Sequence, residues 1–315
     1  MSTNRHALVL GATGGIGGAV TEALLAHGWT VTALTRDPAK AAKGRDPAIR
    51  WTPGDAMNAD EVLAAAEGAS LIVHAVNPPG YRNWAKVVLP MVDNTIAAAR
   101  AVGARILLPG TVYNYGPDAF PVLREDSPQN PRTRKGAIRV EMERRLERSG
   151  LPVLVVRAGD FFGGRSAANT WFAQGLVKPG APLKSVANPG RRGVGHAWAY
   201  LPDLAQTMAE LVAATPAEGF QTFHFAGHFD ADGAQMTSAI RRAAGRDLPL
   251  KAFPWWLAVL ASPFVVTLRE LLEMRYLWKE PLRLDNARLV SVIGPEPHTP
   301  IDQAVKTALA DLKCL

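Results

Sequence analysis

An α/β fold built on a doubly wound parallel sheet is predicted for this chain of 315 residues by two observations. First, short aliphatic and β-branched runs alternate with longer amphipathic or alanine-rich segments through the first half of the chain. Second, the short runs are continuously apolar, which is typical of strands that helices cover on both faces. Strands and helices that alternate at this spacing form right-handed β-α-β crossovers, and hence a parallel sheet.

The expected elements follow in chain order. The first strand ends at a glycine-rich loop, and the fourth ends at Asn77 and Pro78, which are ordinary turn formers. The expected strands are at residues 6–10, 30–34, 49–52, 71–76, 105–108, 153–157 and 220–226. Helical patterns separate them at residues 16–27, 59–67, 84–102, 138–149 and 202–214.

The composition of the chain and the regular alternation of strands and helices change after the strand at 153–157. Residues 163–195 are rich in Gly, Pro and Asn and too long for an ordinary connection, so we expect a binding face there. The tail from Ala234 onward is mostly helical. We therefore expect a sheet domain at 1–162, completed by about 196–226. A smaller, mostly helical substrate-binding part would comprise 163–195 and 227–315.

Composition narrows the class of protein. The hydrophobic fraction of 48% provides a sizeable core, and the net charge of +7 suits an anionic cofactor, a nucleic acid or an anionic membrane. The single cysteine, Cys314, excludes a disulfide framework, and we expect an inert thiol on a frayed tail. The first residues lack a signal-peptide pattern, so we expect a cytoplasmic protein. The apolar stretch at 252–268 contains two prolines and is shorter than the ~20 residues of a membrane span.

Two further classes of site are not expected. The seven histidines show no zinc-protease spacing, so no metal is predicted. The basic residues at 132–148 are interleaved with glutamates, which favours a salt-bridged helix face over a nucleic-acid surface.

The segment LVLGATGGIGG carries the strongest motif. It places Gly11, Gly14 and Gly17 directly after a strand and directly before a helix. Gly11 allows a tight turn, Gly14 the approach of a pyrophosphate, and Gly17 close packing of helix on strand. The helix N-terminus then offers backbone N–H groups to phosphates. We therefore predict a dinucleotide-binding (Rossmann) domain, whose loop also includes Thr13, Gly15 and Ile16.

The tip of the second strand selects the cofactor. A carboxylate there would bind the ribose hydroxyls of NAD, whereas an arginine accommodates the 2′-phosphate of NADP. The tip residue is Arg36, and Asp37 follows it. NADP is therefore favoured, with NAD as the alternative if Asp37 takes the ribose.

These motifs resemble the short-chain dehydrogenase/reductase superfamily, in particular its extended and atypical branch of epimerase/dehydratase-like enzymes. GATGGIGG, TRDP, Gly54–Asp55, HAVNP, PGTVYNYG, VRAGDFFGG and HAWAYLPDLAQTM are each similar to landmarks of that branch. The resemblance implies that Asp55 lies near the adenine, and Ala56 is a further candidate cofactor-binding residue. It also implies that Ala75, Val76 and Asn77 line the cofactor cleft.

The chain departs from this family at its catalytic dyad. Family enzymes use a tyrosine with a lysine four residues later, and none of the five tyrosines here has that partner. By the resemblance, Lys135 takes the tyrosine position and Arg139 the lysine position. Three alternatives stay open. Lys135 could be a general acid, or Lys135 and Arg139 could only bind the phosphate or ribose of the cofactor. In the third alternative, Tyr113 or Tyr115 donates the proton. Thr111 matches the family's hydroxyl residue, which hydrogen-bonds a substrate carbonyl.

The aromatic-rich segment at 253–278 permits three interpretations: a buried cap, an apolar wall of the substrate pocket, or a surface for a partner subunit or a membrane. Asn169, Trp171 and Phe172 would form the opposite wall of the pocket. Two functions are favoured, and a membrane-surface adaptor is the third alternative. One is an NADP-dependent oxidoreductase or epimerase-like enzyme acting on a small carbonyl or alcohol, with a homodimer left open. The other is a catalytically silent NADP(H)-binding redox sensor.

Overall fold

The computed structural model describes residues 5–78, 83–165 and 170–315. Seven strands form a central sheet in the order β11-β7-β5-β4-β1-β2-β3, and all neighbouring pairs are parallel. They are β1 (His6–Leu10), β2 (Thr30–Thr35), β3 (Ile49–Pro53), β4 (Leu71–His74), β5 (Arg105–Thr111), β7 (Val153–Ala158) and β11 (Phe220–His224). The predicted α/β fold class is confirmed.

Helices cover both faces of this sheet, which explains why its strands are apolar throughout. One face carries α1 (Gly15–Ala26), α6 (Leu201–Ala214) and α10 (Ala287–Ile293), whose buried side chains include Leu24, Leu204 and Leu289. The other face carries α3 (Ala59–Ala65), α4 (Trp84–Val102) and α5 (Arg134–Arg148), with Val62, Val92 and Leu146 buried. Each fully buried aliphatic side chain contributes about 1.5–3 kcal/mol.

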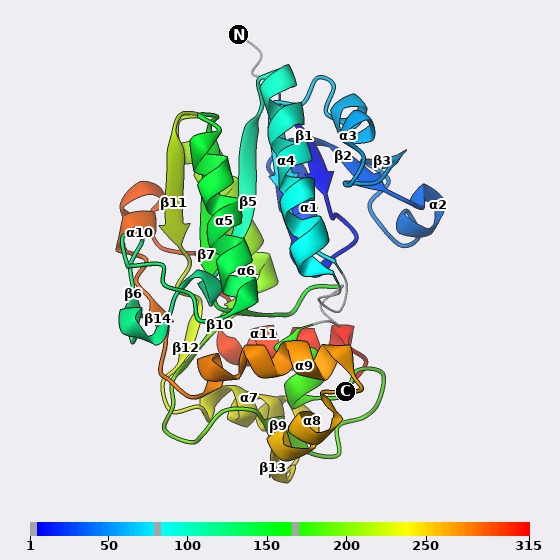
Figure 1. The fold of residues 1–315 in the computed structure, drawn as a ribbon. Coiled ribbons are helices and arrows are strands. Elements are labelled where there is room, and N and C mark those ends of the chain that lie inside the picture. The colour runs from blue at the N-terminus through cyan, green and yellow to red at the C-terminus, as the bar shows by residue number, and fades with distance from the viewer. Residues whose placement is uncertain (1–4, 79–82, 166–169) are drawn as a thin grey trace.

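Most of the remaining elements lie below the carboxyl ends of the strands, whereas α2 lies beside β3 (Figure 1). A three-stranded sheet there consists of β8 (Asp160–Phe162), β10 (His196–Tyr200) and β12 (His228–Asp230). Two small ribbons pair β9 (Val186–Asn188) with β13 (Leu250–Ala252) and β6 (Val122–Leu123) with β14 (Arg283–Leu284). The helices of this part are α7 (Gln235–Ala244), α8 (Trp255–Ala261), α9 (Val266–Glu273) and α11 (Ile301–Asp311). Short helical turns complete the chain at α2 (Pro38–Ala41), Val112–Asn114, Pro117–Ala119, Phe172–Leu176 and Arg275–Trp278.

The start of α5 and the region of Cys314 differ from the sequence-based expectation. Helix α5 begins at Arg134 rather than at 138, because the Thr133 hydroxyl accepts a hydrogen bond from the Gly136 N–H and caps the helix. The expectation of a frayed tail around Cys314 is wrong: the residue is 2% exposed and packs in an apolar cluster with Leu309 and Trp278. Among the described residues, no helix combines the length and the apolar character that crossing a bilayer requires.

Candidate functional site

The candidate site lies where the strand order reverses. β1 has β2 on one side and β4 on the other, so the chain turns in opposite directions at the carboxyl end of β1. Open α/β sheets bind their ligands at this position. Gly11 is at this point with φ +93°, and a Cβ there would lie 2.5 Å from the Ala75 carbonyl oxygen. Only glycine therefore lets the first loop pack against the end of β4.

The glycine loop leads directly into α1. The Gly14 N–H donates to the Gly11 carbonyl (2.9 Å), and Gly14 occupies the N-cap position without a side-chain cap. The first N–H groups of a helix have no acceptor within the helix, and no acidic residue lies in the first turn of α1. Thr13 and Gly14 are exposed, and Gly15 and Ile16 are half-buried. Helix N-termini with these features are the ones that bind anions.

Gly17 has a different role from Gly14. A Cβ at Gly17 would lie 2.2 Å from the Gly11 carbonyl oxygen, whereas one at Gly14 would meet that atom at 3.3 Å. Gly17 is thus required for packing inside the loop. The space around Gly14 is less restricted, so packing inside the loop does not by itself demand glycine there.

Arg36 follows β2 directly and is exposed. Its neighbour Asp37 caps α2, with its carboxylate accepting a hydrogen bond from the Lys40 N–H at 3.0 Å. Because the carboxylate of Asp37 is engaged by the backbone, Arg36 is the charged side chain left for a ligand at this strand end.

The other residues assigned to the cofactor lie at the neighbouring strand ends. Asp55 follows β3, where its carboxylate accepts from the Met57 N–H (3.0 Å), and Ala56 is buried, with its carbonyl bound by Asn94 (2.9 Å). Ala75 and Val76 are half-buried after β4, and Asn77 is exposed. All of these residues lie at the same edge of the sheet as the glycine loop.

Thr111 ends β5 at this edge. Its hydroxyl oxygen accepts a hydrogen bond from the Tyr113 N–H at 3.1 Å, which leaves the hydroxyl hydrogen for another acceptor. Tyr113 is half-buried. Gly136 of α5 packs so closely here that a Cβ on it would lie 2.3 Å from the Tyr113 carbonyl oxygen. The start of α5 and the end of β5 therefore meet.

Lys135 is 1% exposed and is held by α9. Its ammonium donates to the carboxylates of Glu270 and Glu273 and to the Glu270 carbonyl (3.2 Å). The Glu273 carboxylate also accepts from the Lys135 backbone N–H at 3.1 Å. An ammonium has three N–H donors, so α9 saturates this one. In this arrangement Lys135 anchors α9 and has no donor left for a cofactor phosphate.

Arg139, one turn further along α5, faces the end of β4. Its guanidinium lies 5.2 Å from the centroid of the Trp84 ring at the start of α4. It also lies near His74, whose pKa is lowered to about 3 by burial and, to a smaller extent, by this charge. His74 is therefore neutral, and its Nδ1 pairs with the Thr95 hydroxyl at 2.7 Å. Arg139 is thus positioned between α4 and α5, beside the strand end that leads to Ala75 and Val76.

Tyr115 is fully buried in a polar network, and this position disfavours it as an acid for an external substrate. Its phenol oxygen accepts from Arg157 (2.7 Å) and donates to His224 (3.0 Å), whose other nitrogen faces the Leu123 carbonyl (3.2 Å). Glu143 neutralises Arg157 at 2.6 Å. Burial raises the pKa of the Tyr115 phenol, although Arg157 opposes that shift. The network stabilises the interior behind β5 and β7.

Two of the three residues predicted to form a wall of the substrate pocket lie in an apolar core instead. Trp171 is 7% exposed and Phe172 is fully buried, in an apolar cluster with Trp198 and Trp278. Their depth favours packing over direct contact with a substrate. Asn169, the third residue of that prediction, lies outside the described residues.

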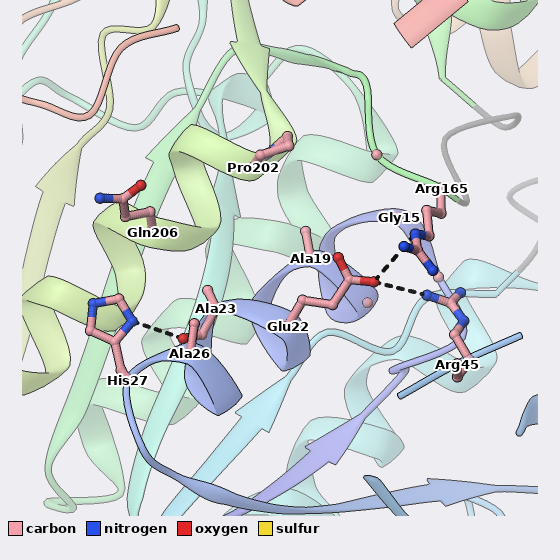
Figure 2. A pocket seen from close by; sticks show the side chains of 13 residues that line it. Gly15, Ala19, Glu22, Ala23, Ala26, His27, Arg45, Arg165, Pro202 and Gln206 are labelled. Carbon is pink, nitrogen blue, oxygen red and sulfur yellow. Dashed lines mark hydrogen bonds and ion pairs between the residues drawn. The ribbon is translucent and has the colours of Figure 1, made fainter. Parts of the chain in front are cut away.

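A cavity of about 380 Å³ opens beside the glycine loop, between α1 and α6. Small side chains of α1 form its floor, and Glu22 lies between Arg45 (3.7 Å) and Arg165 (3.9 Å) at its rim (Figure 2). Because the carboxylate of Glu22 faces both guanidinium groups, this cavity is less suited to a phosphate than the loop itself.

Sequence reasoning missed the residues that α9 and the lower sheet bring to the site. Glu270 and Glu273 lie some 135 residues beyond Lys135, and no spacing in the sequence joins them to it. Asp160 and His196 form a buried pair at 2.8 Å, and the His196 ring stacks on Trp278 at 3.9 Å between centroids. The segment GDFFGG pointed to the region of Asp160 without revealing this partner.

Comparisons with known proteins agree with this geometry. The model of a family described as NAD(P)H-binding matches residues 11–186. The chain is similar to a 3-diazoavenalumate denitrifying reductase from a Streptomyces species, with 33% identity over 174 residues. That match covers 50% of this chain and 56% of the relative, so it spans only about half of either protein.

Solved structures show the same fold over the whole chain. A putative epimerase from Burkholderia cenocepacia is 21% identical, with a TM-score of 0.75 and 99% of each chain covered. A UDP-glucose 4-epimerase from Bifidobacterium longum, solved with NAD+ and UDP, is 15% identical, with a TM-score of 0.72 and 98% of each chain covered. The predicted resemblance to epimerase/dehydratase-like enzymes is confirmed in fold.

Proposed function

Because the chain belongs to the NAD(P)H-binding family, we propose that it binds NADP(H) in preference to NAD(H) and reduces a small carbonyl compound. The observation that carries the cofactor assignment is the uncapped start of α1 behind the glycine loop, with Arg36 at the neighbouring strand end. The similarity of about half of the chain to a reductase supports the direction of the chemistry. When bound, the nicotinamide supplies the hydride.

The chain's own groups would bind and polarise the substrate. The Thr111 hydroxyl, at the end of β5, can donate a hydrogen bond to the substrate oxygen. Tyr113, two residues further, is the better candidate for the proton donor, because Lys135 is saturated by α9 and Tyr115 is fully buried. Arg139 would hold a ribose hydroxyl beside β4.

The test is NADPH oxidation measured with a panel of aldehydes and ketones. With a substrate found, Tyr113→Phe should lower kcat by about 10²–10⁴-fold and leave NADPH affinity unchanged. Lys135→Met should instead loosen α9 and change KM more than kcat. If Tyr113→Phe kept full activity and Lys135→Met lost kcat, Lys135 rather than Tyr113 would be the proton donor.

A second candidate is a silent NADP(H) sensor, and the saturated ammonium at the family's tyrosine position favours it. This function predicts saturable NADPH binding without turnover across the panel. It also predicts that cofactor changes the affinity for a partner protein.

A further inference from the structure

An apolar surface surrounds α8, at the end of the molecule farthest from the top of the central sheet (Figure 1). Three of its side chains are among the most exposed hydrophobic groups: Trp256 (65%), Leu260 (65%) and Phe264 (88%). Leu257, Val259 and Val265 are exposed beside them. We call these six residues the α8 surface.

One side of α8 packs against the rest of the protein. The Trp255 indole donates to the Pro189 carbonyl (2.8 Å), the Arg275 guanidinium lies 5.0 Å from the Trp255 ring centroid, and Ala258 is buried. The α8 side chains Trp256, Leu257, Val259 and Leu260 are apolar as well, and they are exposed. A helix that is apolar all round is normally buried, and contiguous exposed apolar groups mark a surface that meets another apolar phase.

The two chain segments that adjoin this surface carry charges of one sign, although Asp232 and Asp247 lie just beyond them and Asp247 is paired with Arg241. Residues 184–192 and 250–269 contain no Asp or Glu. The two segments are joined by the pairing of β9 with β13 and by the bond from Trp255 to Pro189. Their five cations are all exposed: Lys184, Arg191, Arg192, Lys251 and Arg269. The next carboxylates along the chain, Glu270 and Glu273, face Lys135, although Glu270 also lies 3.7 Å from Arg269.

We propose that the α8 surface attaches the protein peripherally to a bilayer that contains anionic phospholipids. The apolar side chains enter the boundary between headgroups and acyl chains, and the cations meet the lipid phosphates. Tryptophan suits this boundary because its ring is apolar and its N–H is polar. A second copy of the chain is a poorer occupant, since a two-fold contact would bring the same five cations together.

The test is flotation of the full chain with vesicles of phosphatidylcholine, with and without phosphatidylglycerol. We expect binding to the anionic vesicles, weak binding to phosphatidylcholine alone, and release at high salt. The variant Leu260→Asp/Phe264→Asp should abolish binding. Arg191→Gln should lower the affinity about fivefold, because one cation near an anionic surface is worth roughly this factor.

The control is Val290→Asp/Val292→Asp, which places the same charges on exposed valines of α10. It should bind the vesicles like the unmodified chain, and all variants should keep the melting temperature. No flotation with anionic vesicles would overturn the proposal. So would a dimer in sedimentation that Leu260→Asp/Phe264→Asp converts to a monomer, because the second copy would then be the occupant.

Discussion

Arg36 and Asp37 are adjacent charges with different surroundings, and this difference sets the expected cofactor preference. Asp37 is engaged by the Lys40 N–H, whereas Arg36 is exposed beside the glycine loop. A charge-assisted bond to the 2′-phosphate should make NADPH bind more tightly than NADH by about 1–3 kcal/mol. Arg36→Ala should remove most of this difference in a fluorescence titration, and Arg242→Ala, on the remote α7, should not. Equal affinities in the unmodified protein would contradict the assignment.

His74 and His224 make stability depend on pH. Burial lowers the pKa of each to about 3, from an ordinary value of 6.5. The unfolded chain therefore binds more protons than the folded chain between these values, and stability falls as the pH drops from about 6.5 toward 3. We expect the free energy of unfolding, measured with urea, to decrease by several kcal/mol between pH 7 and pH 4.

His74→Asn offers a check on this effect. The Asn amide can keep the bond to Thr95 but cannot take up a proton, so the variant should lose less stability on acidification. An unchanged pH dependence in the variant would show that His74 does not contribute.

Sequence could place these residues on their elements but could not pair the distant ones. The glycine loop and Arg36 were predictable because strand, loop and helix are contiguous and each glycine has a local steric reason. Lys135 was identified by its position alone. Its partners on α9 come from tertiary packing between segments that carry no shared pattern. The same holds for Tyr115, whose burial depends on Arg157 and His224 from two other strands.

At the scale of elements, two glycines in the turn from β1 into α1 are expected to have different roles. Gly14 would serve cofactor binding, and Gly17 serves packing. Gly14→Val places a side chain where a pyrophosphate would approach, yet its backbone (φ −82°) suits any residue. NADPH binding should therefore be lost with little change in melting temperature. Gly17→Val should lower the melting temperature by several degrees, because its Cβ would overlap the Gly11 carbonyl. Unchanged NADPH affinity in Gly14→Val would mean that the loop is structural only.

Helix α9 is the element that the sequence placed least well. It belongs to the aromatic-rich segment at 253–278, for which the sequence allowed a buried cap, a pocket wall or a surface for a partner subunit or a membrane. The structure gives α9 a polar attachment at Lys135. Glu270→Gln/Glu273→Gln removes both ion pairs while keeping the size of the side chains. We expect faster amide hydrogen exchange across Val266–Glu273 and unchanged exchange in α11. Equal protection of α9 in the variant would show that the ion pairs do not hold it.

At the scale of the whole molecule, the two parts of the chain are interleaved. The chain leaves the central sheet after β7 and returns to it as β11, and α10 then packs on α6 with Leu289 fully buried. The expected boundary at 226 would therefore assign α10 to the C-terminal part, although Leu289 lies in the apolar core of the central sheet. A fragment ending at residue 226 would lack α10 and would expose Phe223, which lies in the same cluster.

This interleaving predicts one cooperative unfolding transition for the whole chain rather than two. Because the cofactor would bind only the folded state, NADPH at 100 times its Kd should stabilise that entire transition by about 2.7 kcal/mol. Scanning calorimetry should show a single peak that shifts upward as a unit. Two peaks, of which NADPH moves only one, would mean that the C-terminal part unfolds on its own. In that case the ion pairs of Lys135 on α5 with Glu270 and Glu273 on α9 would not make the C-terminal part unfold together with the central sheet.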